Sequence, residues 1–210
     1  METLDCLAAR VSATQIDPER PLDGEDLRDL VRWACRAPSS FNLQPWRFVA
    51  LTTPGERERL CRAAGADCVS LEAPVVLVVL GDLRACEDHA ETLRLTVEKG
   101  DLVRATADAW VHAAARYFAQ PQAARDEAVR SAAQAAMCLM LAARDRGIAS
   151  AAVQAFDGDA LRREFAISDR YVPVMLIALG YPKAGDTQRQ KVRLGLGVVL
   201  HEGTAEGLPD

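Results

Sequence analysis

Apolar and polar positions recur along the chain with periods that predict helices interleaved with strands. From Leu27 to Ala34 the apolar residues follow the i, i+3, i+4, i+7 spacing of one helix face. Asp23 offers an N-cap side chain, and Pro38 predicts that this helix has ended before it. The stretch 46–52 (WRFVALT) is aromatic and β-branched and therefore predicts a buried strand.

Two further apolar runs, 75–80 (VVLVVL) and 172–179 (VPVMLIAL), predict strands of a sheet that is covered on both faces. Between the first two strands, Thr53 and Glu56 match a capping box with Pro54 at the first helical position. This pattern predicts a helix that runs to about residue 64.

The alanine-rich stretch 84–147 contains one proline, Pro121, and predicts two or three helices. The last of them has the strongest apolar periodicity, and Gly147 suits the position after its end. The middle segment, 110–118, carries aromatic residues on a polar helix; it is either a flap over a pocket or a second packed layer, and the sequence alone favours the packed layer. A short helix is expected after Asp157.

Strands and helices alternate without a repeat, a linker or a break in composition. The pattern therefore predicts one domain over residues 1–210, of the α/β or α+β class, with a sheet covered by helices.

Composition excludes several partners. The net charge is −5 and the 25 Lys and Arg residues are interleaved with acids, which argues against nucleic acid binding. The longest apolar runs are far too short to span a bilayer, so no membrane association is expected. Six cysteines without a C-x-x-C pair, and no visible signal peptide, indicate reduced thiols and a cytoplasmic protein.

The common catalytic motifs are missing from the sequence. It contains no G-x-G-x-x-G, P-loop, G-x-S-x-G or H-E-x-x-H pattern. The histidines, His89, His112 and His201, are far apart and lack metal-ligand spacing, so solvated or capping roles are expected and no metal site is predicted.

The segment 37–46 (APSSFNLQPW) gathers small polar side chains in a loop between a helix and a strand. Two prolines stiffen this loop, which could offer hydroxyls, amides and backbone donors to a flat polar ligand. It could equally be a turn that uses Ser and Asn for its own backbone, and residue chemistry alone favours the turn.

Two pairs of polar residues lie near opposite ends of the chain. Arg10 and Ser12, like Lys191 and Arg193, are two positions apart and would share one side of an extended chain. If the pairs converge, they form a phosphate clamp. Each pair alone is typical of a solvated surface, and sequence spacing does not bring them together.

The sequence resembles the FMN-dependent nitroreductase family over nearly its whole length. The loop APSSFNLQPWRF is close to that family's most specific motif, and Arg10-Val11-Ser12 resembles the start of its N-terminal R-x-S-x-[RK] signature. Three more fragments follow in the family's order: 147–156 (GIASAAVQAF), 169–180 (DRYVPVMLIALG) and 191–194 (KVRL).

The resemblance implies a central mixed sheet flanked by helices and an intertwined homodimer with FMN at the interface. It also implies an N-terminal phosphate-binding arm at about 1–20 and a C-terminal extension at about 190–210; the sequence itself predicts that the tail after Gly203 is disordered. Carried over by position, the implied cofactor contacts are Arg10, Val11, Ser12, Lys191 and Arg193 around the phosphate; Pro38, Ser39, Ser40 and Asn42 from the partner chain; Ser131; and the backbone of Val153 and Gln154, with the Gln154 amide near flavin N5.

The implied activity is hydride transfer from NADH or NADPH, through the flavin, to nitro compounds, quinones or similar small oxidised substrates by a ping-pong mechanism. No side chain is assigned as a catalytic acid or base. Three alternatives stay open: a flavin or quinone reductase with incidental nitro activity, a cofactor-free ligand-binding relative, and a flavin-consuming or dehalogenating relative.

The sequence departs from the family pattern in three places. Thr14 stands where the signature has Arg or Lys, 64–71 lacks the usual Asn or Lys, and Ala152 and Ala155 replace a proline and a glycine. Losing one charge-assisted contact typically costs about 1.5–3 kcal/mol. The hypothesis is therefore that FMN binds more loosely here, or at a lower reduction potential, than in a typical member.

Overall fold

The computed structural model describes residues 2–65, 72–185 and 189–203. Four strands form one sheet in the order β1-β2-β4-β3. The strands are β1 (Trp46–Leu51), β2 (Val75–Asp82), β3 (Ala149–Val153) and β4 (Tyr171–Gly180). The helices are α1 (Thr3–Ala9), α2 (Gly24–Ala34), α3 (Pro54–Ala64), α4 (His89–Glu98), α5 (Arg104–Tyr117), α6 (Pro121–Asp145), α7 (Gly158–Glu164) and α8 (Leu196–Val199), with short 3₁₀ turns at η1 (Ser40–Asn42) and η3 (Ala85–Glu87).

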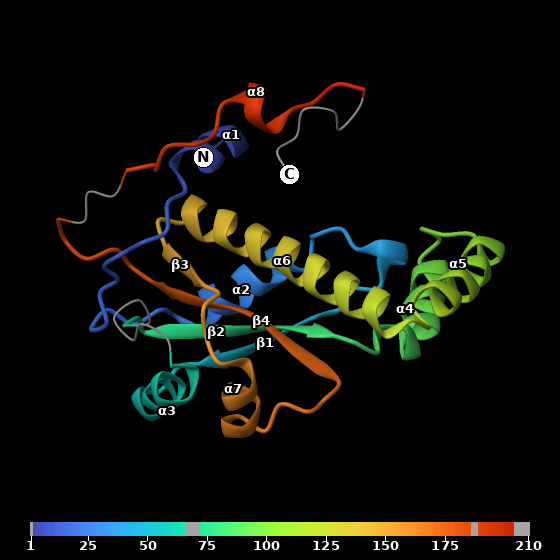
Figure 1. Ribbon diagram of the computed structural model, residues 1–210, viewed down its shortest axis with the longest axis horizontal. Helices are drawn as coiled ribbons and strands as arrows, with labels where there is room; N and C mark the ends of the chain where they lie inside the picture. Colours follow the sequence, from blue (N-terminus) through green and yellow to red (C-terminus); the bar gives the residue numbers. More distant parts are fainter. Residues whose placement is uncertain (1, 66–71, 186–188, 204–210) are drawn as a thin grey trace.

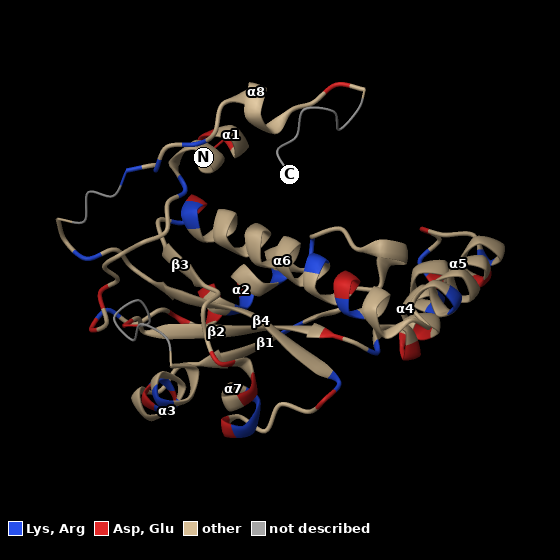
Figure 2. Ribbon diagram, in the orientation of Figure 1, with Lys and Arg blue, Asp and Glu red and all other residues tan. Residues whose placement is uncertain are grey.

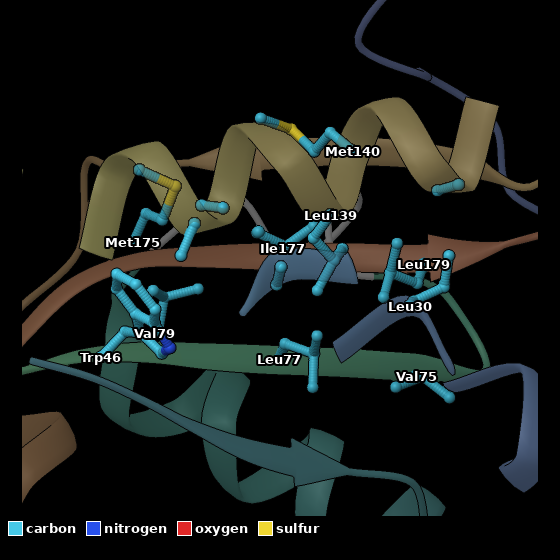
Figure 3. Close-up of a cluster of buried hydrophobic side chains, with 14 of the residues drawn as sticks. Leu30, Trp46, Val75, Leu77, Val79, Leu139, Met140, Met175, Ile177 and Leu179 are labelled. Atoms are coloured by element: carbon cyan, nitrogen blue, oxygen red, sulfur yellow. The ribbon is translucent and has the colours of Figure 1, made fainter. Parts of the chain in front are cut away.

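Helices cover both faces of the sheet, as the continuous apolar strands predicted. The helices α2 and α6 lie on one face, and α3 and α7 lie on the other (Figure 1). Successive residues of β2 point to opposite faces, so Leu77 packs toward α6 while Val76 and Val78 pack toward α3 and α7. Figure 3 shows the α6 side of this core, where Leu139 lies over Leu77 and Ile177.

The four strands pair antiparallel. The four-stranded sheet is therefore antiparallel rather than mixed, and among the described residues parallel pairing is confined to the isolated bridge between Ser12 and Ser150. All three strands expected from apolar runs are present. β3 was not predicted as a strand, because the segment that forms it, ASAAV, has neither the β-branched run nor the alternation that indicates one.

The helix predictions hold in the described part of the chain. Asp23 caps α2 through the backbone N–H of Glu25, and Thr53 and Glu56 complete the capping box of α3. The stretch 84–147 contains three α-helices. The last, α6, is 25 residues long, and Gly147 follows its end with φ +69°.

The long helix α6 determines where both halves of the candidate site lie. It packs on β2 and β4, and a Cβ atom at Gly81 would lie 2.9 Å from backbone atoms of Ala128, so this approach requires glycine. One end of α6 lies beside α4 and α5, and the other end points toward α1 and α8 (Figure 1).

The two terminal helices, α1 and α8, were not predicted from the sequence pattern. Within the described ranges, every helix is too short or too polar to cross a bilayer. The expected disorder after Gly203 concerns residues 204–210, which lie outside the described residues. Residues 66–71 of the segment 64–71, which lacks the family's usual Asn or Lys, also lie outside them.

Candidate functional site

The N-terminal arm is fixed to the free edge of the sheet. Directly after α1 the chain passes β3, where Ser12 bridges to Ser150 in parallel orientation and the Ala13 N–H donates to the Ser150 carbonyl at 2.9 Å. β3 is an edge strand, so its outer backbone groups are available for this pairing. Arg10 and Val11 are thereby held beside the start of β3.

The C-terminal segment meets the arm through Gln190. The Gln190 side-chain amide donates to the backbone carbonyl of Arg10, and the Arg193 guanidinium donates to Gln190 Oε1 at 2.8 Å. Arg193 also donates to the Lys191 carbonyl at 3.0 Å. The segment that carries Lys191 and Arg193 therefore lies against the backbone of Arg10, although the two segments come from opposite ends of the chain. Figure 2 shows basic positions on both segments beside α1.

A small cavity of about 140 Å³ lies beside this convergence. Arg10, Val11, Arg144 and Ser150 are among the residues that line it. The Arg144 Nε atom is buried and has no hydrogen-bond partner among the described residues. A buried guanidinium N–H without an acceptor, next to further cations, suits an anionic ligand.

The expected ring contacts, Val153 and Gln154, lie at the opposite end of β3 from the clamp. Val153 is half-buried and Gln154 is exposed. Because β3 pairs with Ser12 at Ser150, Gln154 follows four residues later, about 13 Å farther along the strand. The clamp and Gln154 therefore lie along the same edge of the sheet, which suits a long ligand with a phosphate at one end.

The loop after α2 has an unusual backbone. Phe41, Asn42 and Gln44 have φ values of 52°, 59° and 50°, in the left-handed region that L-residues rarely adopt. Asparagine tolerates this region, whereas phenylalanine and glutamine do so only when surrounding contacts hold them. Such backbone conformations concentrate at functional sites, which favours a binding role for this loop over the simple turn.

A buried carboxylate on α6, that of Glu127, is hydrogen-bonded to the loop. Glu127 is 3% exposed and accepts four hydrogen bonds. The Ser40 N–H and hydroxyl donate to its two oxygens at 2.9 and 2.7 Å, the Ser131 hydroxyl donates at 2.7 Å, and the Arg130 guanidinium donates at 3.0 Å. Burial raises the pKa of the nearby Cys86 thiol, and the Glu127 charge raises it further.

A buried histidine and two aromatic rings hold the next residue of the loop, Phe41. His89 Nε2 lies 2.7 Å from the Phe41 carbonyl and must be the donor, because a carbonyl only accepts. The Phe41 ring packs edge-to-face against Trp110 and Phe118 of the α5 region, with centroids 6.3 Å apart in both pairs. Two aromatic residues of segment 110–118, Trp110 and Phe118, are therefore packed against the loop, whereas Tyr117 is 64% exposed.

Two expectations about side chains need correction. His89 is 1% exposed rather than solvated, because it packs beneath the loop at the start of α4. Ser131 is also 1% exposed and its hydroxyl donates to Glu127, so within one chain it supports the loop and has no exposed surface for a cofactor. The roles of Glu127 and His89 in holding the loop were not predicted, because their partners are distant in sequence and no motif marks them.

The loop and the clamp lie far apart within one chain. The loop contacts Glu127 and the clamp cavity includes Arg144, and both residues are on α6. Seventeen residues of α-helix separate them, which corresponds to about 25 Å. One chain therefore brings the N-terminal segment with Arg10 and Ser12 beside the C-terminal segment with Lys191 and Arg193. It does not bring Pro38, Ser39, Ser40 and Asn42 to them.

Within the part of the chain that the structure describes, no cluster of His, Cys, Asp or Glu is arranged to hold a metal ion.

A second buried carboxylate, that of Asp82, is bound by the side chains of two arginines. Asp82 accepts two hydrogen bonds from Arg170, both at 2.8 Å, and one from Arg47 at 3.0 Å. The hydrogen bonds to Asp82 and then to Asp88 raise the pKa of the Arg170 guanidinium above its usual value.

Comparison with known proteins gives concordant matches. The profile of the Nitroreductase family matches residues 7–181. "Putative NAD(P)H nitroreductase YodC" of Bacillus subtilis is 36% identical over 200 residues, which are 94% of this chain and 96% of that protein. "NADH dehydrogenase" of Thermus thermophilus is 32% identical over 157 residues, covering 74% and 75%. The crystal structure of "a putative nitroreductase in complex with FMN" from Exiguobacterium sibiricum has a TM-score of 0.88 and 26% identity, covering 96% and 97%.

Proposed function

The chain belongs to the nitroreductase family, and on that premise we propose that it is an NAD(P)H-dependent FMN oxidoreductase. The proposed reaction transfers hydride from NADH or NADPH, by way of FMN, to nitro compounds, quinones or similar small oxidised molecules. The observation that supports the proposal is the contact of Arg10 with the segment from Gln190 to Arg193, because it brings together two segments that carry cations suited to a flavin phosphate.

The residues present fit the phosphate of FMN. Arg10, Lys191 and Arg193 are cationic side chains of two segments that Gln190 links, and Ser12, two residues after Arg10, adds a hydroxyl to the first segment. Guanidinium groups match phosphate oxygens in a planar, bidentate geometry. The buried Arg144 Nε would gain the acceptor that it lacks among the described residues.

Bound FMN would supply the redox chemistry, since a flavin accepts hydride from a nicotinamide and donates it to an acceptor. The chain's residues bind and orient. Val153 and Gln154 would lie against the ring, with a backbone N–H of Gln154 as donor. Both substrates would use the same open face in turn, which predicts ping-pong kinetics, and no side chain is needed as acid or base.

We propose a homodimer in which the loop from Pro38 to Asn42 completes the site of the partner. The separation of loop and clamp by about 25 Å along α6 supports this arrangement. The ends of the chain also expose apolar side chains, with Leu4 77% and Val192 97% exposed. Further exposed apolar residues of the C-terminal segment are Leu194, Leu196, Val198, Val199 and Leu200. Such apolar surface is typical of a subunit interface.

The visible absorption spectrum of the purified protein tests the proposal. We expect protein-bound flavin, present on purification or retained after adding FMN and removing the unbound excess by gel filtration, whose spectrum bleaches when NADH or NADPH is added without oxygen. Sedimentation of the same sample should give the mass of a dimer. A protein that retains no FMN once the excess has been removed would contradict the proposal and favour the cofactor-free relative. Steady-state rates with nitro compounds and quinones would separate the remaining acceptors.

Thr14→Arg tests the hypothesis that FMN is held loosely. Thr14 is exposed, two residues beyond Ser12 in the arm. A cation there would add an exposed charge contact to the bound flavin, worth up to about 1 kcal/mol. We expect the dissociation constant for FMN to fall about fivefold, measured by quenching of flavin fluorescence.

Thr14→Gln is the matched control, since it lengthens the side chain without adding charge. If Thr14→Arg leaves both the FMN affinity and the midpoint potential unchanged, the hypothesis of a missing charge contact is wrong.

A further inference from the structure

We propose that Glu127 is a positioning residue, assisted by His89, that holds the loop from Ser39 to Gln44 in the conformation presented to the flavin of the partner subunit. The inference rests on the proposed function, because the loop needs this shape only if it meets a ligand. It assigns a role to two buried polar groups that redox chemistry itself does not use.

The carboxylate of Glu127 is fully committed to the protein. An ionised carboxylate offers about four acceptor positions. Two donors reach each oxygen: the Ser40 N–H and the Ser131 hydroxyl on Oε1, and the Ser40 hydroxyl and Arg130 on Oε2. With its side chain 4% exposed, Glu127 has neither the surface nor a spare acceptor to contact a substrate. Its effect therefore passes through Ser40.

Glu127 determines which groups of the loop face outward. Both donors of Ser40, its N–H and its hydroxyl, are used on Glu127, so Ser40 presents only acceptor capacity to a ligand. The Ser39 hydroxyl oxygen accepts the Gln44 N–H at 2.9 Å, which leaves its O–H free to donate. Adjacent serines thus present opposite hydrogen-bonding characters, and this polarity depends on the buried carboxylate.

His89 fixes the residue that follows. Its Nε2–H holds the Phe41 carbonyl at 2.7 Å, and Phe41 is the first of the three left-handed residues. The Phe41 ring is held separately by Trp110 and Phe118. Glu127 therefore holds Ser40, while His89 and the two aromatic rings hold Phe41. At these adjacent residues the backbone enters the left-handed region, which it would leave without such contacts.

The experiment compares Glu127→Ala and Glu127→Gln with Glu91→Gln, an exposed carboxylate on α4, as the matched control. Three properties are measured: the FMN dissociation constant, the visible spectrum of bound FMN, and amide hydrogen exchange of the segment 39–44 without flavin. We expect Glu127→Ala to weaken FMN binding about tenfold, to shift the flavin bands and to speed exchange of the loop amides. The control should match the wild type.

Glu127→Gln should recover part of each effect. Its carbonyl oxygen can still accept from the Ser40 N–H and the Ser131 hydroxyl. Its NH₂ group faces the Ser40 hydroxyl, which can rotate to accept, and the Arg130 guanidinium, which can only donate. If Glu127→Ala fails to fold, Glu127→Gln and Ser131→Ala provide the same three measurements. His89→Gln, tested in parallel, should speed exchange chiefly in the Phe41–Asn42 part of the loop.

The outcomes separate this inference from the proposed function. Unchanged loop exchange and an unchanged flavin spectrum in a folded Glu127→Ala protein would overturn the inference while leaving the oxidoreductase proposal standing. Wild-type protein that binds no FMN would overturn the proposed function and with it the role of the loop toward a flavin. The exchange measurement, which needs no flavin, would then decide whether Glu127 shapes the loop at all.

Discussion

Replacing Lys191 and Arg193 together with alanine is expected to raise the FMN dissociation constant at least a hundredfold. Both side chains are exposed, on a segment that the Gln190 side chain joins to the backbone carbonyl of Arg10. Each charge-assisted hydrogen bond to a phosphate contributes about 1.5–3 kcal/mol, so two together correspond to about two orders of magnitude or more. Equilibrium titration of the flavin-free protein, followed by fluorescence, measures this change.

Arg189→Ala provides the control. Arg189 lies in the same segment but is not one of the predicted phosphate contacts, so its replacement removes one positive charge without removing a contact. Its effect should be small and should vanish at high salt, since it acts only at long range. Equal losses for Arg189→Ala and Arg193→Ala would show general attraction to a basic segment and would contradict the clamp.

Asp82→Asn is expected to cost about 3 kcal/mol of unfolding free energy. The Asp82 side chain is fully buried and accepts hydrogen bonds from Arg47, from two nitrogens of Arg170 and from the Arg84 N–H. Asparagine keeps the shape but turns an NH₂ group toward guanidinium donors, so buried donors face each other. For a protein of this size the melting temperature should fall by about 6–12 °C.

The control for this prediction acts on the same arginine. Asp88 accepts from Arg170 at 2.5 Å, but its side chain is 64% exposed. Asp88→Asn should therefore cost at most about 1 kcal/mol. Thermal unfolding of the two variants at equal protein concentration measures the difference. Equal losses would mean that burial does not determine the strength of this network.

Local sequence patterns predicted the helices and strands whose own apolar residues pack into the core. The apolar runs that became β1, β2 and β4, the helical spacing of α2 and α6 and the capping box of α3 were all visible, because each of these patterns is local in sequence. The caps at Asp23 and Thr53 were visible for the same reason. The alanine-rich β3 was not, since its strand conformation comes from pairing with β4 and not from its own side chains.

The candidate site divides in the same way. The sequence identified Arg10, Ser12, Lys191 and Arg193 as a clamp only on the condition that they converge, and that condition depends on a hydrogen bond between residues 180 positions apart. It pointed to the loop from Pro38 to Asn42 through its resemblance to a family motif. The sequence did not indicate how the loop is held.

The tertiary structure alone decided the shape of that loop. Glu127 meets Ser40 across 87 positions, and His89 meets Phe41 across 48. No local pattern records such pairs, because a buried carboxylate or imidazole is stable wherever the fold supplies enough partners. Local chemistry therefore determined the helices, the strands and the types of residue at the site. Packing of α6 against the sheet determined which of those residues meet, and it placed the two halves of the site at opposite ends of one helix.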